Sequence, residues 1–407
     1  MENRYDKYKD SGIAWIGEIP EHWKVKKGKN LFKKEERPVR DNDEIVTCFR
    51  DGEVTLRSNR RIDGFTNAMK EVGYQGVRRG DLVIHNMDAF AGAIGVSDSD
   101  GKSTPVYSVC TPKNNVEANV YYYAYLLRSY ALGGVIQSLA KGIRERSTDF
   151  RYKEFGDLYY QQPPIEEQQS IASYLDQKCG EIDKLITLQE EMITKLQSYK
   201  QSVITEAVTK GLDKNVPLKD SGIEWIGEIP EHWSVVKIKY LAKIKSGDSI
   251  SSNEIMQEGI YEVYGGNGLM GFCNKKNVDG VNIIIGRVGA LCGNVRLISE
   301  SKFITDNALI LNCFDNALYS YMYIMLKAAN LNNLNTSNAQ PLITGSKVLN
   351  VSLPIPPLSE QQSITNYLDQ KCSEIDELIS IKQQKIEKLK DYKKSLIFEC
   401  VTGKRKV

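Results

Sequence analysis

The stretch "DSGIAWIGEIPEHW" (residues 10–23) occurs a second time as "DSGIEWIGEIPEHW" (residues 220–233). The two copies differ only at Ala14 and Glu224, and their mixed composition excludes low-complexity sequence. A block that returns this faithfully after 210 positions is a copied structural unit rather than a chance match. The chain therefore builds one structural element twice.

A second pair of repeats follows the first. The segment "PPIEEQQSIASYLDQKCGEIDKLI" from Pro163 returns 193 positions later as "PPLSEQQSITNYLDQKCSEIDELI" from Pro356. After each Pro-Pro, only Gly180 interrupts the helical pattern before Gly211 and Gly403, which suit the C-terminal cap of a helix. Each segment therefore predicts a helix of roughly 40 residues, about 60 Å long.

Helices of this length need a partner, and the economical partner for each is the other. If the halves are related by a pseudo-twofold axis perpendicular to the helices, the two must run antiparallel. Apolar residues recur at heptad spacing in both segments, as Ile182, Leu185, Met192, Leu196, Tyr199 and Val203, and as Ile375, Leu378, Ile386, Leu389, Tyr392 and Leu396. Gln189 and Lys382 interrupt these stripes at equivalent positions, so we expect the polar pair to fix the register. The alternative is that both side chains face solvent.

The regions between the repeats are dissimilar in the two halves. They carry short β-type runs such as "GDLVIHNM" and "GVNIIIGRVG", and one helical stretch each, "VYYYAYLLRSYA" and "LYSYMYIMLKAA". The predicted fold class is α+β, with two pseudo-twofold-related, β-rich globular domains joined by two long helices that form an antiparallel coiled coil. The expected boundaries are 1–160 for the first domain, 161–212 for the first helix, 213–353 for the second domain and 354–407 for the second helix.

Bulk composition narrows the class of protein. No run approaches the ~20 apolar residues that a membrane span needs, and the charged start "MENRYDKYKD" lacks the apolar core of a signal peptide, so a cytoplasmic location is expected. The eight cysteines show no C-x-x-C spacing and no nearby histidine pair, which favours reduced thiols over disulfides or a metal site.

Motifs of catalysis are absent or malformed. In "GVSDSDGKST" (residues 95–104) the glycine spacing is one residue too long for a phosphate-binding P-loop, and two aspartates would repel the phosphates. The G-x-G-x-x-G match in "YGGNGLMG" is not followed by an amphipathic helix. The methyltransferase motif (Asn/Asp)-Pro-Pro-(Tyr/Phe) is replaced by "QPPI" and "IPPL" at helix starts. No catalytic residue and no metal ligand is therefore predicted.

Basic residues favour a nucleic-acid partner. Residues 24–160 carry 23 Lys+Arg against 18 Asp+Glu, whereas residues 163–210 carry 5 against 8, so the positive excess lies in the dissimilar region and not in the first long helix. The basic residues cluster in "KVKKGKNLFKK", "RSNRR", "VRRG" and "KGIRERSTDFRYK". For any one cluster the alternative is a solvated face, but four clusters in one domain favour phosphate and base contacts.

The repeated "DSGI-W-IGEIPEHW", the helix entry "IPIPPLSEQQSI" and the run "YGGNG...IIIGRVGALCGNV...ITDNALIL" resemble the specificity subunits of type I restriction-modification systems. The resemblance implies two target-recognition domains, each reading one half of a split, asymmetric double-stranded DNA target, with the helices setting the spacer. It also implies two modification subunits that methylate adenine N6 with S-adenosylmethionine. Two restriction subunits would add cleavage driven by ATP with Mg²⁺, while this chain binds no cofactor.

The resemblance also implies roles for individual residues. The duplicated frame would present two equivalent docking surfaces to partner subunits through Trp15, Trp23, Trp225 and Trp233. We expect DNA contacts from loops unique to each half, namely Arg57, Arg60, Arg61, Arg78, Arg144 and Arg146, and Gly266, Asn267, Arg287, Asn307, Asn338 and Gln340. The alternatives are a fused specificity chain with its own nuclease or methyltransferase activity, and a coiled-coil scaffold that binds only protein.

Overall fold

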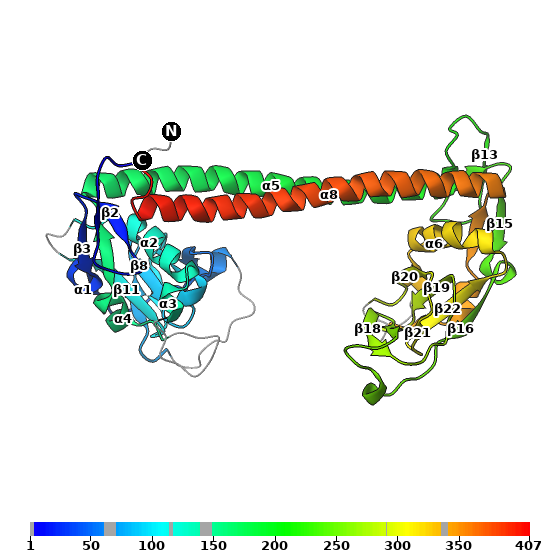
Figure 1. Cartoon of the computed structure of the whole chain (residues 1–407), viewed down its shortest axis with the longest axis horizontal. Coiled ribbons are helices and arrows are strands. Elements are labelled where there is room, and N and C mark those ends of the chain that lie inside the picture. Colours follow the sequence, from blue (N-terminus) through cyan, green and yellow to red (C-terminus); the bar gives the residue numbers. More distant parts are fainter. Residues whose placement is uncertain (1–3, 61–70, 114–116, 139–148, 290, 335–340) are drawn as a thin grey trace. The chain divides into compact units, whose positions relative to one another are not determined.

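The computed structural model describes the chain in six stretches, residues 4–60, 71–113, 117–138, 149–289, 291–334 and 341–407 (Figure 1). The chain forms two compact units, Met1–Gln189 with Gln384–Val407 as the first and Glu190–Gln383 as the second. The long helices α5 (Ile165–Lys210) and α8 (Leu358–Val401) contribute residues to both units. The boundaries of the four expected segments stay a prediction.

The first unit is organised around a four-stranded antiparallel sheet. Its strand order is β4-β11-β8-β9, formed by Phe32–Lys34, Tyr107–Pro112, Leu82–His85 and Ile94–Val96. The run "GDLVIHNM" therefore supplies a central strand, as its alternation predicts. Four two-stranded pairs flank this sheet: β1 (Tyr8–Asp10) with β2 (Glu18–Pro20), β3 (Lys24–Lys27) with β12 (Tyr159–Gln162), β5 (Val46–Cys48) with β6 (Val54–Leu56), and β7 (Gln75–Val77) with β10 (Gly101–Ser103). The segment that resembles a P-loop (residues 95–104) therefore contains strand β10 near its end.

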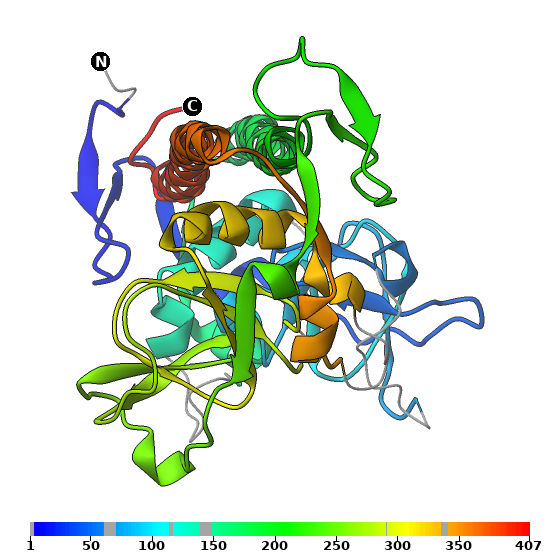
Figure 2. The same ribbon diagram turned by 90° about the vertical axis from the view of Figure 1, so that its right-hand side faces the viewer.

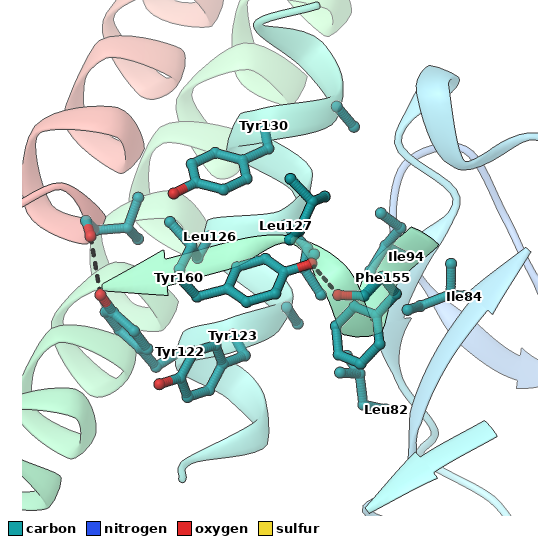
Figure 3. Packing of buried hydrophobic residues seen from close by; sticks show 14 of the residues in the cluster. Leu82, Ile84, Ile94, Tyr122, Tyr123, Leu126, Leu127, Tyr130, Phe155 and Tyr160 are labelled. Atoms are coloured by element: carbon teal, nitrogen blue, oxygen red, sulfur yellow. Dashed lines mark hydrogen bonds between the residues drawn. The ribbon is translucent and has the colours of Figure 1, made fainter. Parts of the chain in front are cut away.

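A tyrosine-rich helix covers this sheet. Helix α2 (Val120–Leu132) is capped by Asn119, whose side chain accepts from the backbone N–H groups of Tyr121 and Tyr122. The short helix α1 (Gly28–Leu31) precedes it in the chain, and α3 (Val135–Ser138) and α4 (Tyr152–Asp157) follow it. Figure 3 shows the buried rings meeting aliphatic side chains of the sheet. Each buried phenol that the figure marks with a dashed line has an acceptor: Tyr122 donates to the carbonyl of Val401 at 2.9 Å, and Tyr160 to the carbonyl of Phe155 at 3.0 Å.

The second unit repeats the same sheet with different residues. Its order β16-β22-β19-β20 joins Ala242–Ser246, Ala308–Cys313, Asn282–Gly286 and Val295–Ile298. A three-stranded sheet of β18 (Gly268–Cys273), β17 (Tyr261–Gly265) and β21 (Phe303–Ile304) also lies in this unit. The pairs β13 (Leu218–Asp220) with β14 (Glu228–Pro230) and β15 (Ser234–Lys237) with β23 (Ser352–Ile355) repeat the pairs β1 with β2 and β3 with β12 of the first unit. The dissimilar regions therefore share a scaffold and differ in what is attached to it.

Helix α6 (Tyr319–Ala328) takes the place of α2, and α7 (Gly345–Leu349) precedes β23. Figure 2 looks along the two long helices and shows α6 beneath them. Tyr321 of α6 donates to the carbonyl of Val208 at 3.4 Å, as Tyr122 of α2 does to the carbonyl of Val401. Each globular domain is thus attached by a tyrosine to the last turn of the helix that ends beside it.

The two long helices run antiparallel within each unit. In the second unit, Met192 Sδ lies 3.2 Å from Lys382 Nζ and Lys200 Nζ lies 2.5 Å from Asp376 Oδ2, so positions rise along α5 as they fall along α8. In the first unit, Lys393 Nζ lies 2.7 Å from Asp183 Oδ2. Asp183 and Lys200 are the counterparts of Asp376 and Lys393 under the 193-residue offset, so the chain forms the same ion pair once in each unit.

The heptad prediction is right for one line of residues and wrong for the other. Ile182 and Val203 of α5 are buried, as are Ile375, Ile386 and Leu396 of α8. In contrast, the second predicted line is exposed, at Leu185, Met192, Tyr199, Leu378 and Tyr392. Partly buried residues four positions after the first line, such as Ile186 and Ile193, complete the stripe instead. A spacing of three and a spacing of four fit a helical stripe almost equally well, so the sequence does not distinguish them.

The polar interruptions lie on the buried stripe of their own helices. Gln189 is 7% exposed and Lys382 is half-buried. Their pairing and their role in the register stay a prediction.

The eight cysteines all fall within the described residues and form no disulfide there. Within the same residues, no helix has the length and apolarity needed to cross a bilayer.

Candidate nucleic-acid interface

Four of the six residues predicted for DNA contact in the second half come together at one end of its sheet. Gly266 and Asn267 form the turn between β17 and β18, and Arg296 of β20 donates to the carbonyl of Asn267 at 3.0 Å. The turn packs so closely that a Cβ on Gly266 would lie 2.6 Å from the carbonyl oxygen of Asn307. Glycine is therefore required there by the approach of a second loop.

Arg287 joins this cluster through its backbone. Its N–H donates to the carbonyl of Asn307 at 3.0 Å, and its carbonyl accepts from the N–H of Ile343 at 3.0 Å. The side chains of Asn267 and Asn307 are exposed, and the guanidinium of Arg287 is half-buried. Its Nη1 makes only long contacts, 3.4 Å to Ser246 Oγ and 3.5 Å to the carbonyl of Asp306. The loop cluster thus holds an arginine and two asparagines, the residue types that can read guanine and adenine edges.

The first unit arranges its backbone in the same way. The N–H of Asn86 donates to the carbonyl of Val106 at 2.9 Å, and the carbonyl of Asn86 accepts from Phe150 at 3.1 Å. These bonds match those of Arg287 with Asn307 and Ile343 in the second unit. The loop ends after β8 and before β11 are therefore the counterpart of the loop ends after β19 and before β22.

Arg57 and Arg60 line one cavity of about 670 Å³ beside these loop ends. Arg60 lies over the ring of Phe49 at 4.2 Å and pairs with Asp51 at 2.5 Å and with Glu53 at 3.0 Å. The hydrogen bond to Asp51 raises the pKa of Arg60. Arg57 Nε donates to Thr47 Oγ1 at 3.3 Å. Both guanidinium groups are held in place by acceptors of the β5–β6 hairpin.

Arg78 is placed differently from the other two. Its side chain is 14% exposed, pairs with Asp43 at 3.1 Å and donates to the carbonyl of Gly101 at 3.0 Å. These bonds tie β7 to β10, which is a structural role, and its contact with DNA stays a prediction. Five predicted contacts lie outside the described residues, Arg61, Arg144, Arg146, Asn338 and Gln340.

Three basic residues that were not singled out lie beside the same loop ends. Lys34, Arg151 and Lys153 line a cavity of about 530 Å³ together with Asn86 and Ser108. Arg151 and Lys153 belong to the basic cluster that ends at Lys153, which was the only signal for them. Lys34 ends another basic cluster, "KVKKGKNLFKK", and its proximity to Arg151 and Lys153 depends on the pairing of β4 with β11.

The repeated block lies at the junction where one long helix begins and the other ends. In the first unit, Trp23 is fully buried and its Nε1–H donates to Glu167 Oε2 at 2.9 Å, while His22 Nε2 lies 2.6 Å from Glu167 Oε1. Glu167 lies in the first turn of α5, where the helix dipole favours a carboxylate. Gly403 follows α8 with φ 73°, and a Cβ there would lie 3.0 Å from the Trp23 ring.

The second unit builds the same junction. Trp233 Nε1–H donates to Glu360 Oε2 at 2.9 Å, and His232 Nε2 lies 2.6 Å from Glu360 Oε1. Gly211 ends α5 beside the ring of Trp233. The remaining tryptophans are exposed to the same degree, Trp15 at 42% and Trp225 at 41%. Trp23 and Trp233 are thus interior frame residues, whereas Trp15 and Trp225 present their rings to solvent.

Acidification should weaken the first junction. Burial alone would raise the pKa of Glu167, but hydrogen bonds from Trp23, His22 and Tyr5 outweigh it and lower that pKa below the ordinary glutamate value. This stabilisation is complete above about pH 4.5 and is lost as the pH falls through the lower folded-state pKa. Denaturant unfolding at pH 7, 4.5 and 3.5 should show the stability gap between the wild type and Glu167→Gln closing as the pH falls.

The control for that experiment is Glu166→Gln, which removes the same charge from an exposed position in the same helical turn. It should leave the pH dependence as in the wild type. A gap that stays constant from pH 7 to pH 3.5 would contradict the role of the Glu167 carboxylate.

Among the residues that the structure describes, no group of three or more His, Cys, Asp and Glu side chains is arranged to hold a metal ion. The described residues instead offer two polar loop clusters and two junctions built from the same repeated residues.

Residues 230–391 match the protein family described as "Type I restriction modification DNA specificity domain". Over nearly its whole length the chain is similar to the "Putative type I restriction enzyme MjaX specificity subunit" of Methanocaldococcus jannaschii, with 27% identity and 96% of each chain covered. The "Type I restriction enzyme EcoprrI specificity subunit" of Escherichia coli is 32% identical over 32% of this chain and 33% of its own length.

Two solved structures share the fold. A chain described under "Structural basis underlying complex assembly and conformational transition of the type I R-M system" matches with a TM-score of 0.74 and 16% identity, over 94% of this chain and 98% of its own. The HsdS subunit from Thermoanaerobacter tengcongensis matches with a TM-score of 0.54 and 17% identity, over 95% and 98%. The α+β fold class predicted from the sequence is confirmed.

Proposed function

We propose that the chain is a specificity subunit of a type I restriction-modification system, because residues 230–391 match that domain family and the similarity to the MjaX subunit covers 96% of both chains. The protein is a sequence-specific DNA-binding subunit without catalysis of its own. Its two globular domains each read one half of a bipartite, asymmetric target. The observation that carries this proposal is that two dissimilar domains are held by one repeated junction, so that the readers differ while their attachment does not.

In this proposal each domain contacts DNA with the loop ends at one end of its sheet. The second domain offers Asn267, Arg287 and Asn307 there. The first domain offers the cavity beside Arg57 and Arg60 and the basic rim of Lys34, Arg151 and Lys153. Arginine forks and amides read base edges in the major groove, and lysines hold phosphates. The predicted contacts Arg61, Arg144, Arg146, Asn338 and Gln340 lie outside the described residues and stay part of the proposal.

The repeated frame supplies two equivalent docking surfaces for two modification subunits. Exposed apolar side chains occur in matched pairs under the 193-residue offset, with Leu185 and Leu378 at 44% and 47% and Leu188 and Ile381 at 49% and 52%. Exposed apolar rows of this kind mark protein contacts. Two restriction subunits complete the complex in the cytoplasm. S-adenosylmethionine, ATP and Mg²⁺ are used by these partners for adenine-N6 methylation and ATP-dependent cleavage, and this chain binds none of them.

Substitution of the loop cluster in the second domain should relax one half of the target. Asn267→Ala and Arg287→Ala should each cost about 1–3 kcal/mol of discrimination if the side chain makes a bidentate base contact. The readout is the methylation motif, in which the second half-site should degenerate while the first stays unchanged as an internal control. Lys219→Ala, an exposed residue of β13 away from the cluster, should change nothing. An intact motif with both variants would remove these residues from the interface.

The experiment that tests the function is co-expression of the chain with the modification subunit of its own system in a host that lacks other methylases. N6-methyladenine should map to a split motif with two dissimilar halves at a fixed spacing. A continuous motif would mean that one domain does not read DNA. A stable complex without methylation would favour a protein-only scaffold, and methylation or cleavage by the isolated chain with Mg²⁺ and S-adenosylmethionine would favour a fused enzyme.

A further inference from the structure

The two junctions are built from copied residues, but among the described residues a tyrosine side chain packs only against the first. In the first unit Tyr5, which precedes the copied block, lies against the junction with its ring 5.9 Å from Trp23 and 5.6 Å from His22. Its hydroxyl donates to Glu167 Oε2 at 2.9 Å. Burial and this hydrogen bond raise the pKa of Tyr5, so the phenol stays a donor. Glu167 thus accepts from three side chains, those of Trp23, His22 and Tyr5.

The second junction has a cavity at the corresponding place. A space of about 300 Å³ is lined by Leu212, Val216, Pro230, His232, Glu360 and Ile364. Pro230, His232 and Glu360 are the counterparts of Pro20, His22 and Glu167, and His22 and Glu167 are the residues that Tyr5 contacts in the first unit. Among the described residues, no aromatic ring packs against His232 or Trp233 as Tyr5 packs against His22 and Trp23. The side chain of Glu360 is 39% exposed, against 31% for Glu167.

The residue that takes the position of Tyr5 in the second copy is Asn215, under the 210-residue offset of the opening block. Asn215 is exposed, and its backbone N–H donates to Asp213 Oδ1 at 2.9 Å. The register of the two blocks is the same at this point, because Glu21 N–H donates to Lys7 O and Glu231 N–H to Pro217 O, at 3.1 and 2.9 Å. The two blocks therefore share their register from Lys7 and Pro217 onward, and the position that holds a tyrosine beside the first junction holds an asparagine of a turn beside the second.

We propose that the cavity beside Glu360 and His232 is a docking site for a tyrosine side chain presented by the modification subunit that binds the second half of the frame. The inference rests on the proposed function and adds that the two docking surfaces differ at this one place. The first half of the frame carries its own tyrosine, Tyr5, and the second half binds a tyrosine of the partner subunit.

The chemistry of the cavity fits a phenol in particular. Val216, Pro230 and Ile364 offer apolar walls for a ring, and the side chain of Glu360, which also lines the cavity, offers oxygen acceptors for a hydroxyl. A second copy of this chain cannot supply the group from Tyr5, because that side chain is already held by Glu167 in its own unit. In the proposed function the modification subunit is the partner that meets the frame, so the phenol is assigned to that subunit.

A photo-crosslinking experiment tests the inference in the intact chain with its modification subunit. A benzophenone amino acid at Val216, which lines the cavity, should crosslink to a tyrosine-containing peptide of the modification subunit. The same group at Asp6, the counterpart of Val216 beside the filled junction, should crosslink to no such peptide. A crosslink to a second copy of this chain, or none from position 216 while the complex still forms and methylates DNA, would overturn the inference and leave the proposed function standing. Failure of the complex to form would instead count against the proposed function.

A competition variant gives an independent readout. Asn215→Tyr should place a phenol of the chain itself in the cavity, raise the melting temperature of the free chain and weaken binding of the second modification subunit by about tenfold. Asn215→Phe, which lacks the hydroxyl, should do both less strongly, and Asn215→Ser should do neither. Unchanged stoichiometry and affinity with Asn215→Tyr, in a chain whose melting temperature has risen, would show that the filled cavity is not where the partner binds.

Discussion

Replacing Trp23 with alanine should lower the free energy of unfolding of the first unit by about 3–5 kcal/mol. The ring is fully buried and packs against Gly403 and Tyr5, so its loss leaves a cavity at the point where α5 begins and α8 ends. The loss of the indole N–H also leaves Glu167 without one of its three donors. Hydrogen exchange followed on peptides of the first unit is the suitable measurement, because a chain of two units need not unfold in one step.

Two variants calibrate this result. Trp233→Ala should weaken the second unit by a comparable amount, since Trp233 has the same burial and the same bond to Glu360. Trp15→Ala removes an equally large ring from the same repeated block, but that ring is 42% exposed, so its cost should stay below about 1 kcal/mol. If Trp23→Ala cost no more than Trp15→Ala, the junction would not be what anchors the domain to the helices.

A chain cut after Leu212 should form a homodimer and direct methylation to a palindromic target. In the first unit the domain packs against Leu396, Cys400 and Val401 at the end of α8. The counterparts at the end of α5 are Val203, Ala207 and Val208, which the second domain buries in the same way. The helix end of each half therefore provides the apolar surface against which the globular domain of the other half packs.

Specific polar contacts would also form between two half chains in the homodimer. Lys200 of one half chain would pair with Asp183 of the other, because the intact chain makes the equivalent pairs with Asp376 and Lys393. The carbonyl of Val208 would accept from Tyr122, as the carbonyl of Val401 does now. A symmetric dimer of this kind reads the same half-site twice, so its motif becomes a split palindrome.

Light scattering of the half chain and mapping of N6-methyladenine with the modification subunit are the measurements. Val203→Asp, which places a carboxylate in the buried stripe, should abolish the dimer and the methylation together. A half chain that stays folded and monomeric, or a dimer with a non-palindromic motif, would contradict the equivalence of the two helix ends.

Local patterns allowed much of the fold to be predicted. The strands β8 and β19 and the helices α2 and α6 form where their periodicity indicates, and α5 and α8 end at Gly211 and Gly403 because only glycine adopts the left-handed conformation there at low cost. The phase of the helical stripe could not be predicted in full. Leu185 and Ile186 fit a heptad almost equally, and only the packing of neighbouring elements buries one and exposes the other.

The candidate interface could likewise be predicted from the sequence only in part. Asn267, Arg287 and Asn307 carry side chains suited to base edges, which the sequence reveals. Arg78 carries the same guanidinium, but its hydrogen bonds go to Asp43 and to the carbonyl of Gly101. Whether a guanidinium faces outward depends on which acceptors the fold places next to it. Arg296 and Lys34 could not be predicted as members of the loop clusters, because strand pairing brings them there from distant positions.

The sequence by itself determined that the protein has two halves, that a copied block and a long helix frame each half, and that the regions between them differ. Repeats and hydrophobic periodicities along the chain predict these features. Only the tertiary structure decided which residues of three separate segments meet in each loop cluster, and that Tyr5 fills one junction while Asn215 leaves the other open. The reason is physical: backbone hydrogen bonds between strands far apart in sequence place the loops, and the side chain that completes a copied site comes from outside the copy.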